Sequence, residues 1–158
     1  MNALAVTIRQ GDEGEQRWFC GGGLHTWKVT ESDSGGAFLM WESLEEGGKA
    51  TPLHLHADAD ETFHLLEGAV VLYLDNEERS VRTGGVAVVP RGVPHAFKVT
   101  SPHARMLWVH TPGGGEAFYR VASDPVIPGE GRPPVNFGRV KAAAESTGGA
   151  EILGPPPE

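Results

Sequence analysis

The chain has 158 residues, a formal net charge of −8 at neutral pH and an apolar fraction of 39%. These values are typical of one domain with a substantial core, and the negative charge disfavours nucleic acid or an anionic membrane as a partner, because phosphates would be repelled. A single cysteine, Cys20, excludes an intrachain disulfide and a thiolate-rich metal site. No apolar run could cross a bilayer and residues 1–10 lack the pattern of a secretion signal, so we expect a cytoplasmic protein.

The elements predicted in chain order are mostly short strands. Runs of β-favouring residues between glycine-rich or polar turns predict strands at 16–19, 24–30, 36–45, 52–56, 61–66, 69–74, 80–82, 85–89, 95–100 and 105–111. Their short and even spacing favours a sandwich or barrel over a βαβ fold. The sequence shows no internal repeat, so we expect one all-β barrel.

The segment after this barrel has a different composition. A helical turn is predicted at 116–121 and a proline-rich linker at 124–134, and Asn136 can cap an alanine-rich helix that ends before two glycines. The tail that follows is expected to be extended. We therefore expect a barrel with N-terminal strands over residues 1–112 and a C-terminal extension over 113–158, with short helices and a proline-rich tail, packed on the same domain.

Four metal-capable side chains occur in two glycine-framed motifs. The motifs read Gly48-(five residues)-His54-Leu55-His56-(four residues)-Glu61-(six residues)-Gly68 and Gly84-(five residues)-Pro90-Arg91-Gly92-(two residues)-His95. Alternate residues of a strand share a face, so His54 and His56 point the same way, and Glu61 opens the next strand. His95 begins a later strand after a turn. In a closed barrel these inward positions would converge in the lumen.

Three imidazoles and one carboxylate define the kind of ion that could bind. Such a set suits Ni, Fe, Co, Mn, Cu or Zn and is poor for Ca or Mg. A divalent ion held by one carboxylate keeps residual positive charge, so it can bind an enolate-like oxygen with water or O2 beside it. A lone His-x-His pair is often only structural, but six spacings agree here together with the framing glycines.

The two motifs resemble those of the cupin superfamily. The resemblance implies a small β-barrel, a double-stranded β-helix or jelly roll, with one divalent transition metal held by His54, His56, Glu61 and His95. The chain departs from the pattern at Val99, where an asparagine that is not a ligand often stands. Residues 61–68, 89–97, 109–120 and 151–158 are similar to those of bacterial single-domain quercetinase-like cupins.

This narrower resemblance implies a metal-dependent dioxygenase that cleaves a flavonol-like, enolisable aromatic substrate with O2. Glu61 would act as general base on the substrate hydroxyl. Two alternatives remain open: a metal-dependent isomerase or lyase acting on a small oxyanion substrate, and a non-enzymatic cupin that binds a small molecule. Dependence of turnover on O2 separates the dioxygenase from the isomerase or lyase.

A flat aromatic substrate requires a mostly apolar pocket. Alternation places Phe63 and Leu65 on the face of Glu61, and Phe97 on that of His95. Further lining candidates are Met40, Trp41, Met106 and Trp108, although alternation alone does not decide which of each neighbouring pair faces inward. Barrel cores are also built from such residues.

Other polar residues are expected to lie away from the metal. His64 falls on the opposite face of its strand, and His25, His103 and His110 lack ligand spacing, so these three are expected to be exposed or structurally hydrogen-bonded. The acidic segment 42–46 is interpreted as a solvated strand end.

Open sheet edges and outward apolar residues indicate a homodimer. The residues concerned are Val71, Val86 and Val88. The resemblance points the same way, because similar cupins pair through their sheets.

Overall fold

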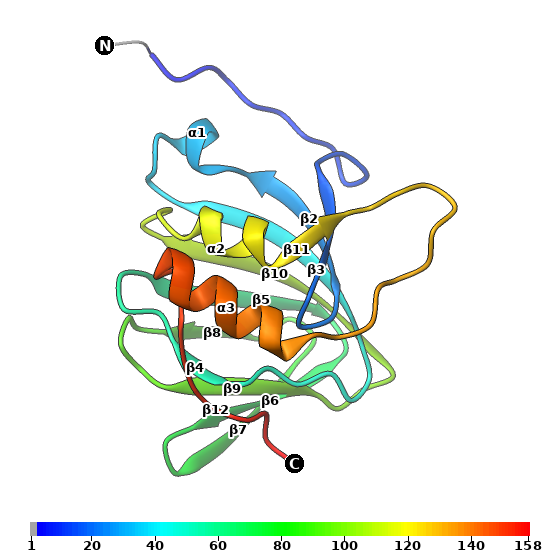
Figure 1. Cartoon of the computed structure of the whole chain (residues 1–158), viewed down its shortest axis with the longest axis vertical. Coiled ribbons are helices and arrows are strands. Elements are labelled where there is room, and N and C mark those ends of the chain that lie inside the picture. The colour runs from blue at the N-terminus through cyan, green and yellow to red at the C-terminus, as the bar shows by residue number, and fades with distance from the viewer. Residues whose placement is uncertain (1–2) are drawn as a thin grey trace.

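In the computed structural model, which describes residues 3–158, the chain folds into two antiparallel sheets with three helices. The strands are β1 (Gln16–Phe19), β2 (Leu24–Val29), β3 (Leu39–Glu46), β4 (Leu53–Leu55), β5 (Asp60–Glu67), β6 (Ala69–Leu74), β7 (Glu77–Arg82), β8 (Val86–Val89), β9 (His95–Val99), β10 (His103–Thr111), β11 (Ser123–Pro125) and β12 (Glu151–Gly154). One sheet has the order β11-β1-β2-β3-β10-β5-β8 and the other β12-β4-β9-β6-β7 (Figure 1). The predicted all-β jelly roll is confirmed.

The core lies between the inner faces of the two sheets. Burial alternates along the central strands, so that Leu39 and Trp41 of β3 and Phe63 of β5 point inward. From the smaller sheet, Leu72 and Phe97 belong to the same core cluster. Burying each such side chain stabilises the fold by about 1.5–3 kcal/mol. Since the same alternation governs polar residues on these strands, it also directs the candidate ligands inward.

The helices are α1 (Glu31–Ser34), α2 (Glu116–Val121) and α3 (Phe137–Thr147). As expected, Asn136 caps α3: its Oδ1 accepts a hydrogen bond from the backbone N–H of Arg139 at 3.0 Å. The one-turn helix α1 was not predicted, because four polar residues carry no apolar period; its capping box with Thr30 holds it. Within residues 3–158, no helix has the length and apolar character needed to cross a membrane.

Two short strands lie beyond residue 112. β11 pairs with β1 at the edge of the larger sheet, and β12 pairs with β4 in the smaller one. The sequence predicted a linker and an extended tail in these places. Strands of three and four residues, one containing a proline and the other a glycine, are too short to be stable alone, so the neighbouring strand supplies their order.

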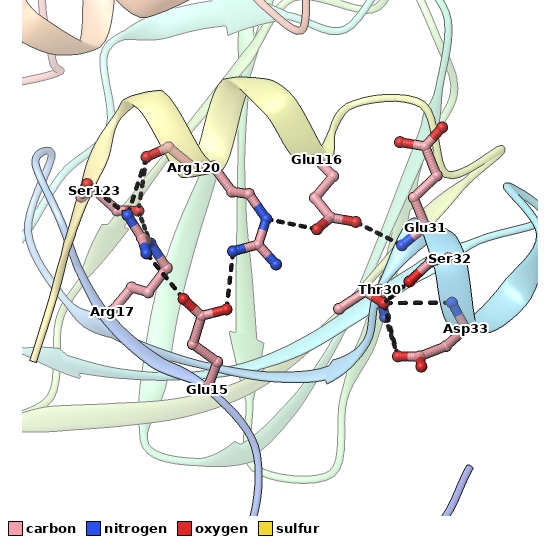
Figure 2. A network of polar contacts seen from close by, with 9 residues as sticks. All are labelled: Glu15, Arg17, Thr30, Glu31, Ser32, Asp33, Glu116, Arg120 and Ser123. Atoms are coloured by element: carbon pink, nitrogen blue, oxygen red, sulfur yellow. Dashed lines mark hydrogen bonds and ion pairs between the residues drawn. The ribbon is translucent and has the colours of Figure 1, made fainter.

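A polar network fastens α2 to the N-terminal part of the chain (Figure 2). Arg120 donates to Glu116 at 2.6 Å and to Glu15 at 2.8 Å, and Glu116 also accepts from the first backbone N–H of α1 at 2.6 Å. These contacts hold α2 so that Phe118 and Tyr119 are buried against the barrel. Both side chains line the cavity described below.

Candidate metal centre

The structure brings the four candidate ligands together on the inner face of the barrel. His54 lies on β4, His56 directly follows it, Glu61 is on β5 and His95 begins β9. One ligand atom from each lies within 4.8 Å of the others. Ligands about 2.0–2.2 Å from a shared ion can be at most about 4.4 Å apart, so shifts of a few tenths of an ångström would close the site around a metal.

All three histidines present the same ring nitrogen to the centre. Each Nδ1 lies 2.8–2.9 Å from a backbone carbonyl oxygen: His54 from that of Pro52, His56 from that of Gly149 and His95 from that of Val93. A carbonyl oxygen can only accept, so the proton of each neutral ring is on Nδ1. The lone pair of each Nε2 is therefore free for a metal.

The free Nε2 atoms of two histidines face the carboxylate of Glu61. His56 Nε2 lies 3.1 Å from Oε2, and His95 Nε2 lies 3.2 Å from Oε1. With protons on Nδ1, each contact sets one acceptor against another, and His56 Nε2 is buried without a hydrogen-bond partner in the part of the chain that the structure describes. Only a cation, either a proton or a metal ion, makes this arrangement favourable. The donor set thus fits a divalent transition metal.

The protonation states of His54 and Glu61 agree with this role, whereas at His95 a proton would compete with the metal. Burial, reinforced by the neighbouring His95 and His56, lowers the pKa of His54 to about 3, so this ring is neutral near pH 7. Burial alone would raise the pKa of Glu61, but hydrogen bonding, chiefly from His110, holds that pKa well below its usual range. Burial disfavours the charged form of His95, yet contact with Glu61 outweighs it and raises the pKa.

His110 is a part of the site that the ligand spacing did not reveal. It pairs in register with Glu61 across β10 and β5, and its Nε2 lies 2.7 Å from Glu61 Oε2. Burial lowers the pKa of His110, so the neutral ring donates this hydrogen bond. Tyr119 Oη lies 3.3 Å from the same nitrogen. His110 therefore orients the Glu61 carboxylate, and its inward position two residues after Trp108 was the available signal.

A cavity of about 60 Å³ adjoins the ligands. It has space for four to six water molecules at roughly 10–15 Å³ each. Its aromatic walls include Trp41, Phe97 and Trp108 from the predicted lining set, and Val140 of α3 and Ile152 of β12 also line it. The C-terminal extension thus contributes to the wall beside the metal site.

The other predicted lining residues lie elsewhere. Phe63, Leu65 and Met106 are fully buried in the packed core. Met40 alternates with Trp41 along β3, so it points to the opposite face of the sheet and is only half-buried. A shared face with a ligand is therefore not sufficient to reach the cavity, because part of that face is covered by the opposing sheet.

The expectation for two polar residues is wrong. His25, which was expected to be exposed or hydrogen-bonded, is buried against the ring of Phe19 and lines the cavity. Glu45, which was assigned to a solvated strand end, is 1% exposed and also lines the cavity, together with Lys49. The alternation that directs Trp41 inward directs Glu45 inward too, and the pairing with Lys49 makes this burial tolerable.

Comparison with known proteins agrees with this architecture. A family model described as "Cupin domain" matches residues 40–110, which hold all four candidate ligands. Together with the jelly roll and the three-histidine, one-glutamate cluster, this match identifies a cupin domain over residues 40–110. Two curated relatives of the chain are quercetinases.

Quercetin 2,3-dioxygenase of Bacillus subtilis (strain 168) is 29% identical over 118 residues, which is 75% of this chain and 35% of that protein. Quercetin 2,3-dioxygenase of Aspergillus japonicus is 30% identical over 103 residues, covering 61% of this chain and 29% of that protein. The chain thus spans about a third of the length of these relatives. A solved structure titled as a sugar phosphate isomerase of the cupin superfamily, from Silicibacter pomeroyi, is 26% identical with a TM-score of 0.57, covering 66% of this chain and 75% of that one.

The carbonyl of Gly149 offers a test of the histidine orientation. A side-chain Cβ at this position would overlap Phe118 Cβ, so Gly149→Ala must displace the carbonyl that holds His56. We expect metal affinity to fall about 10–100-fold, the usual effect of losing a group that orients a ligand. Calorimetric titration of metal into the metal-free protein measures this. Gly114→Ala is the control, because a Cβ there meets nothing within 4 Å, and equal affinities for both variants would contradict the assigned role.

Proposed function

We propose that the chain is a metal-dependent dioxygenase that uses O2 to cleave an enolisable, hydroxylated aromatic substrate. One observation carries the proposal: three Nε2 lone pairs and one carboxylate converge beside an aromatic-lined cavity. Similarity to two quercetin 2,3-dioxygenases supports this choice of reaction. A bound divalent metal would supply positive charge for the substrate's enolate oxygen and a place for O2 beside it.

The residues of the chain have two tasks in this reaction. Glu61 is ionised near neutral pH because its pKa is held low, so it can accept a proton but is a weak base. It therefore suits an acidic hydroxyl, such as an enol or phenol placed against a cation. The N–H of His110 keeps the carboxylate oriented while it takes this proton. Trp41 and Trp108, whose rings are nearly parallel at 6.1 Å, exclude water and offer flat surfaces to an aromatic ring.

The size of the cavity bears on the substrate. A volume of about 60 Å³ is smaller than the cavity of roughly 150 Å³ that holds one benzene molecule. Even a single-ring substrate therefore requires the cavity walls to move outward, and a flavonol requires a larger movement. A flavonol would enter if Val140 and Ile152 moved outward with the C-terminal extension. Both sizes of substrate therefore belong in the first experiment.

Aerobic loss of quercetin absorbance tests the proposed reaction. The protein is loaded separately with Ni, Co, Mn and Fe and compared with each free metal and with an anaerobic sample. We expect bleaching that requires protein, metal and O2 together. A single-ring hydroxyketone such as maltol is tested in parallel by O2 uptake. If no metal supports either reaction, the dioxygenase proposal fails.

The second candidate is a metal-dependent isomerase or lyase acting on a small oxyanion substrate. It is favoured by the 26% identity to the solved structure titled as a sugar phosphate isomerase and by the small cavity. The same ligand set would polarise a carbonyl without O2. Turnover that persists under argon would select this candidate, whereas a purely binding cupin would show neither reaction.

We also propose that the protein forms a homodimer through the edge of the larger sheet. Val86 and Val88 alternate along β8, the last strand of the sheet, and are 59% and 62% exposed, so this edge offers apolar side chains beside backbone groups that could pair with a second copy. Val71 on β6 of the other sheet is half-buried. Sedimentation equilibrium reports the mass directly.

A further inference from the structure

A second group of polar residues lines the cavity at a distance from the metal ligands. Leu39 at the start of β3 pairs with His110, which contacts Glu61, whereas Glu45 lies six residues further along the same strand. At about 3.3 Å per residue this places the Glu45 backbone roughly 20 Å from that of Leu39. Glu45 and Glu61 both line one cavity, so their side chains reach it from strand positions about six residues apart along the sheet.

Glu45 and Lys49 form a buried charged pair in this second group. Their side chains are 1% and 9% exposed, and Lys49 Nζ lies 3.0 Å from Glu45 Oε2 and 5.0 Å from the centroid of the Phe97 ring. A buried pair is a weak source of stability, because desolvation offsets the attraction. The fold also makes room for it, since a Cβ at Gly23 would overlap the Glu45 carboxylate. A structural role alone therefore accounts poorly for its presence.

The pair leaves hydrogen-bonding capacity unused. Among residues 3–158, Glu45 Oε2 is buried and has Lys49 Nζ at 3.0 Å as its charged contact, without a further hydrogen bond. Trp41 Nε1, which belongs to a residue of the same cavity wall, is buried and has no acceptor within this described part of the chain. The neighbouring Trp108 differs, because its Nε1 donates to Ser43 Oγ at 2.8 Å. The residues around the cavity thus include one carboxylate oxygen that can accept a further hydrogen bond and one indole N–H that can donate one.

These free groups select a particular ligand chemistry. Only a ligand group with a proton to donate can satisfy Glu45 Oε2, and Lys49 beside it favours an oxygen that also accepts. A hydroxyl group does both. A carboxylate or phosphate has no such proton near neutral pH and would be repelled by Glu45, whose charge offsets that of Lys49.

We propose that Glu45 and Lys49 form a subsite that binds a hydroxyl group of the substrate at the end remote from its metal-binding oxygen. Trp41 Nε1 donates to an oxygen on the ring between the two ends. The proposal rests on the proposed function, because that function places the reacting oxygen at the metal ligands. It narrows the substrate to aromatic or enolic rings that carry a second, uncharged hydroxyl.

Two single-ring chelators that differ by one oxygen test the subsite. Kojic acid carries a hydroxymethyl group across the ring from its chelating hydroxyketone, and allomaltol carries a methyl group in its place. Binding of each to zinc-loaded protein is measured by calorimetry, without turnover. We expect the wild-type chain to prefer kojic acid about tenfold, as for a hydrogen bond to a charged group. Glu45→Gln should reduce this preference to about twofold or less, because the isosteric amide is uncharged and a weaker acceptor.

Glu42→Gln is the matched control. Glu42 lies on the outer face of the same strand and pairs with Arg105 at 3.1 Å, so this variant should keep the full preference. Equal affinities of the wild-type chain for the two chelators would overturn the subsite, and so would an unchanged preference in Glu45→Gln. The wild-type comparison holds even if the Glu45 variant does not fold.

The chelator and turnover measurements together distinguish failure of the subsite from failure of the proposed function. A preference for kojic acid without any O2-dependent turnover supports the subsite and removes the dioxygenase. Quercetin bleaching without a hydroxyl preference supports the dioxygenase and removes the subsite. If neither chelator binds to the zinc-loaded protein, the metal does not receive an enolate oxygen, and both proposals fall.

Discussion

Replacing His54 with alanine is expected to leave a protein that folds but does not retain a divalent metal. His54 supplies one of three neutral imidazole donors, and its Nδ1 is already bonded to a backbone carbonyl, so no other side chain replaces its Nε2. Loss of a group that merely orients a ligand costs about 10–100-fold in affinity, so loss of the ligand itself should cost more than about 100-fold. Metal analysis after dialysis should find about one ion per wild-type chain and almost none in the variant.

His64→Ala controls for the loss of any histidine near this strand. His64 lies on β5, three residues after Glu61, and alternation directs it away from the inner face. The His64→Ala variant should therefore retain metal as the wild-type chain does. Unchanged metal content in His54→Ala, with circular dichroism showing a folded barrel, would refute the assignment of the metal centre.

Glu61→Gln is expected to lower turnover about 10²–10⁴-fold while metal is still bound at saturating concentration. The amide oxygen can remain a ligand and accept from His110, which now donates to the carboxylate at 2.7 Å. The amide cannot take the proton of the substrate hydroxyl. Initial rates of O2 uptake, measured with metal in excess, separate this effect from weaker metal binding.

Asp60→Asn is the control for the Glu61 variant. Asp60 immediately precedes Glu61 but pairs with Arg91 in a contact of 3.1 Å at the exposed rim, so its loss should leave turnover within about twofold. If Glu61→Gln retains wild-type turnover, the carboxylate is not the base, and proton transfer must be assigned to another group.

The fold class and the cluster of candidate ligands could be predicted because both depend on short-range patterns. Strand alternation alone puts His54 and His56 on one side, and the glycine-framed spacing predicts the turns that return Glu61 and His95 to the same place. Both patterns involve residues that are close together in the sequence, so they can be recognised in one sequence alone.

The second half of the cavity depends on contacts between distant segments. Burial of Glu45 requires Lys49 and the space left by Gly23 in the turn between β1 and β2, and the charged pattern of residues 42–46 pointed to solvent instead. His110 becomes important only through its register with Glu61. Tyr119 reaches the site because a polar network fixes α2. None of these relations has a local signature, although alternation with Trp41 would have placed Glu45 inward.

The hydrogen bond from His56 to Gly149 links the metal centre to the order of protein synthesis. The two residues are 93 positions apart, so at about 5–20 residues per second the carbonyl leaves the ribosome roughly 5–20 s after the imidazole. Once His95 has also emerged, the nascent chain carries every ligand but still lacks the group that fixes the tautomer of His56. Tight metal uptake is thus deferred until β12 can dock, and early capture of an ion by a half-folded barrel is disfavoured.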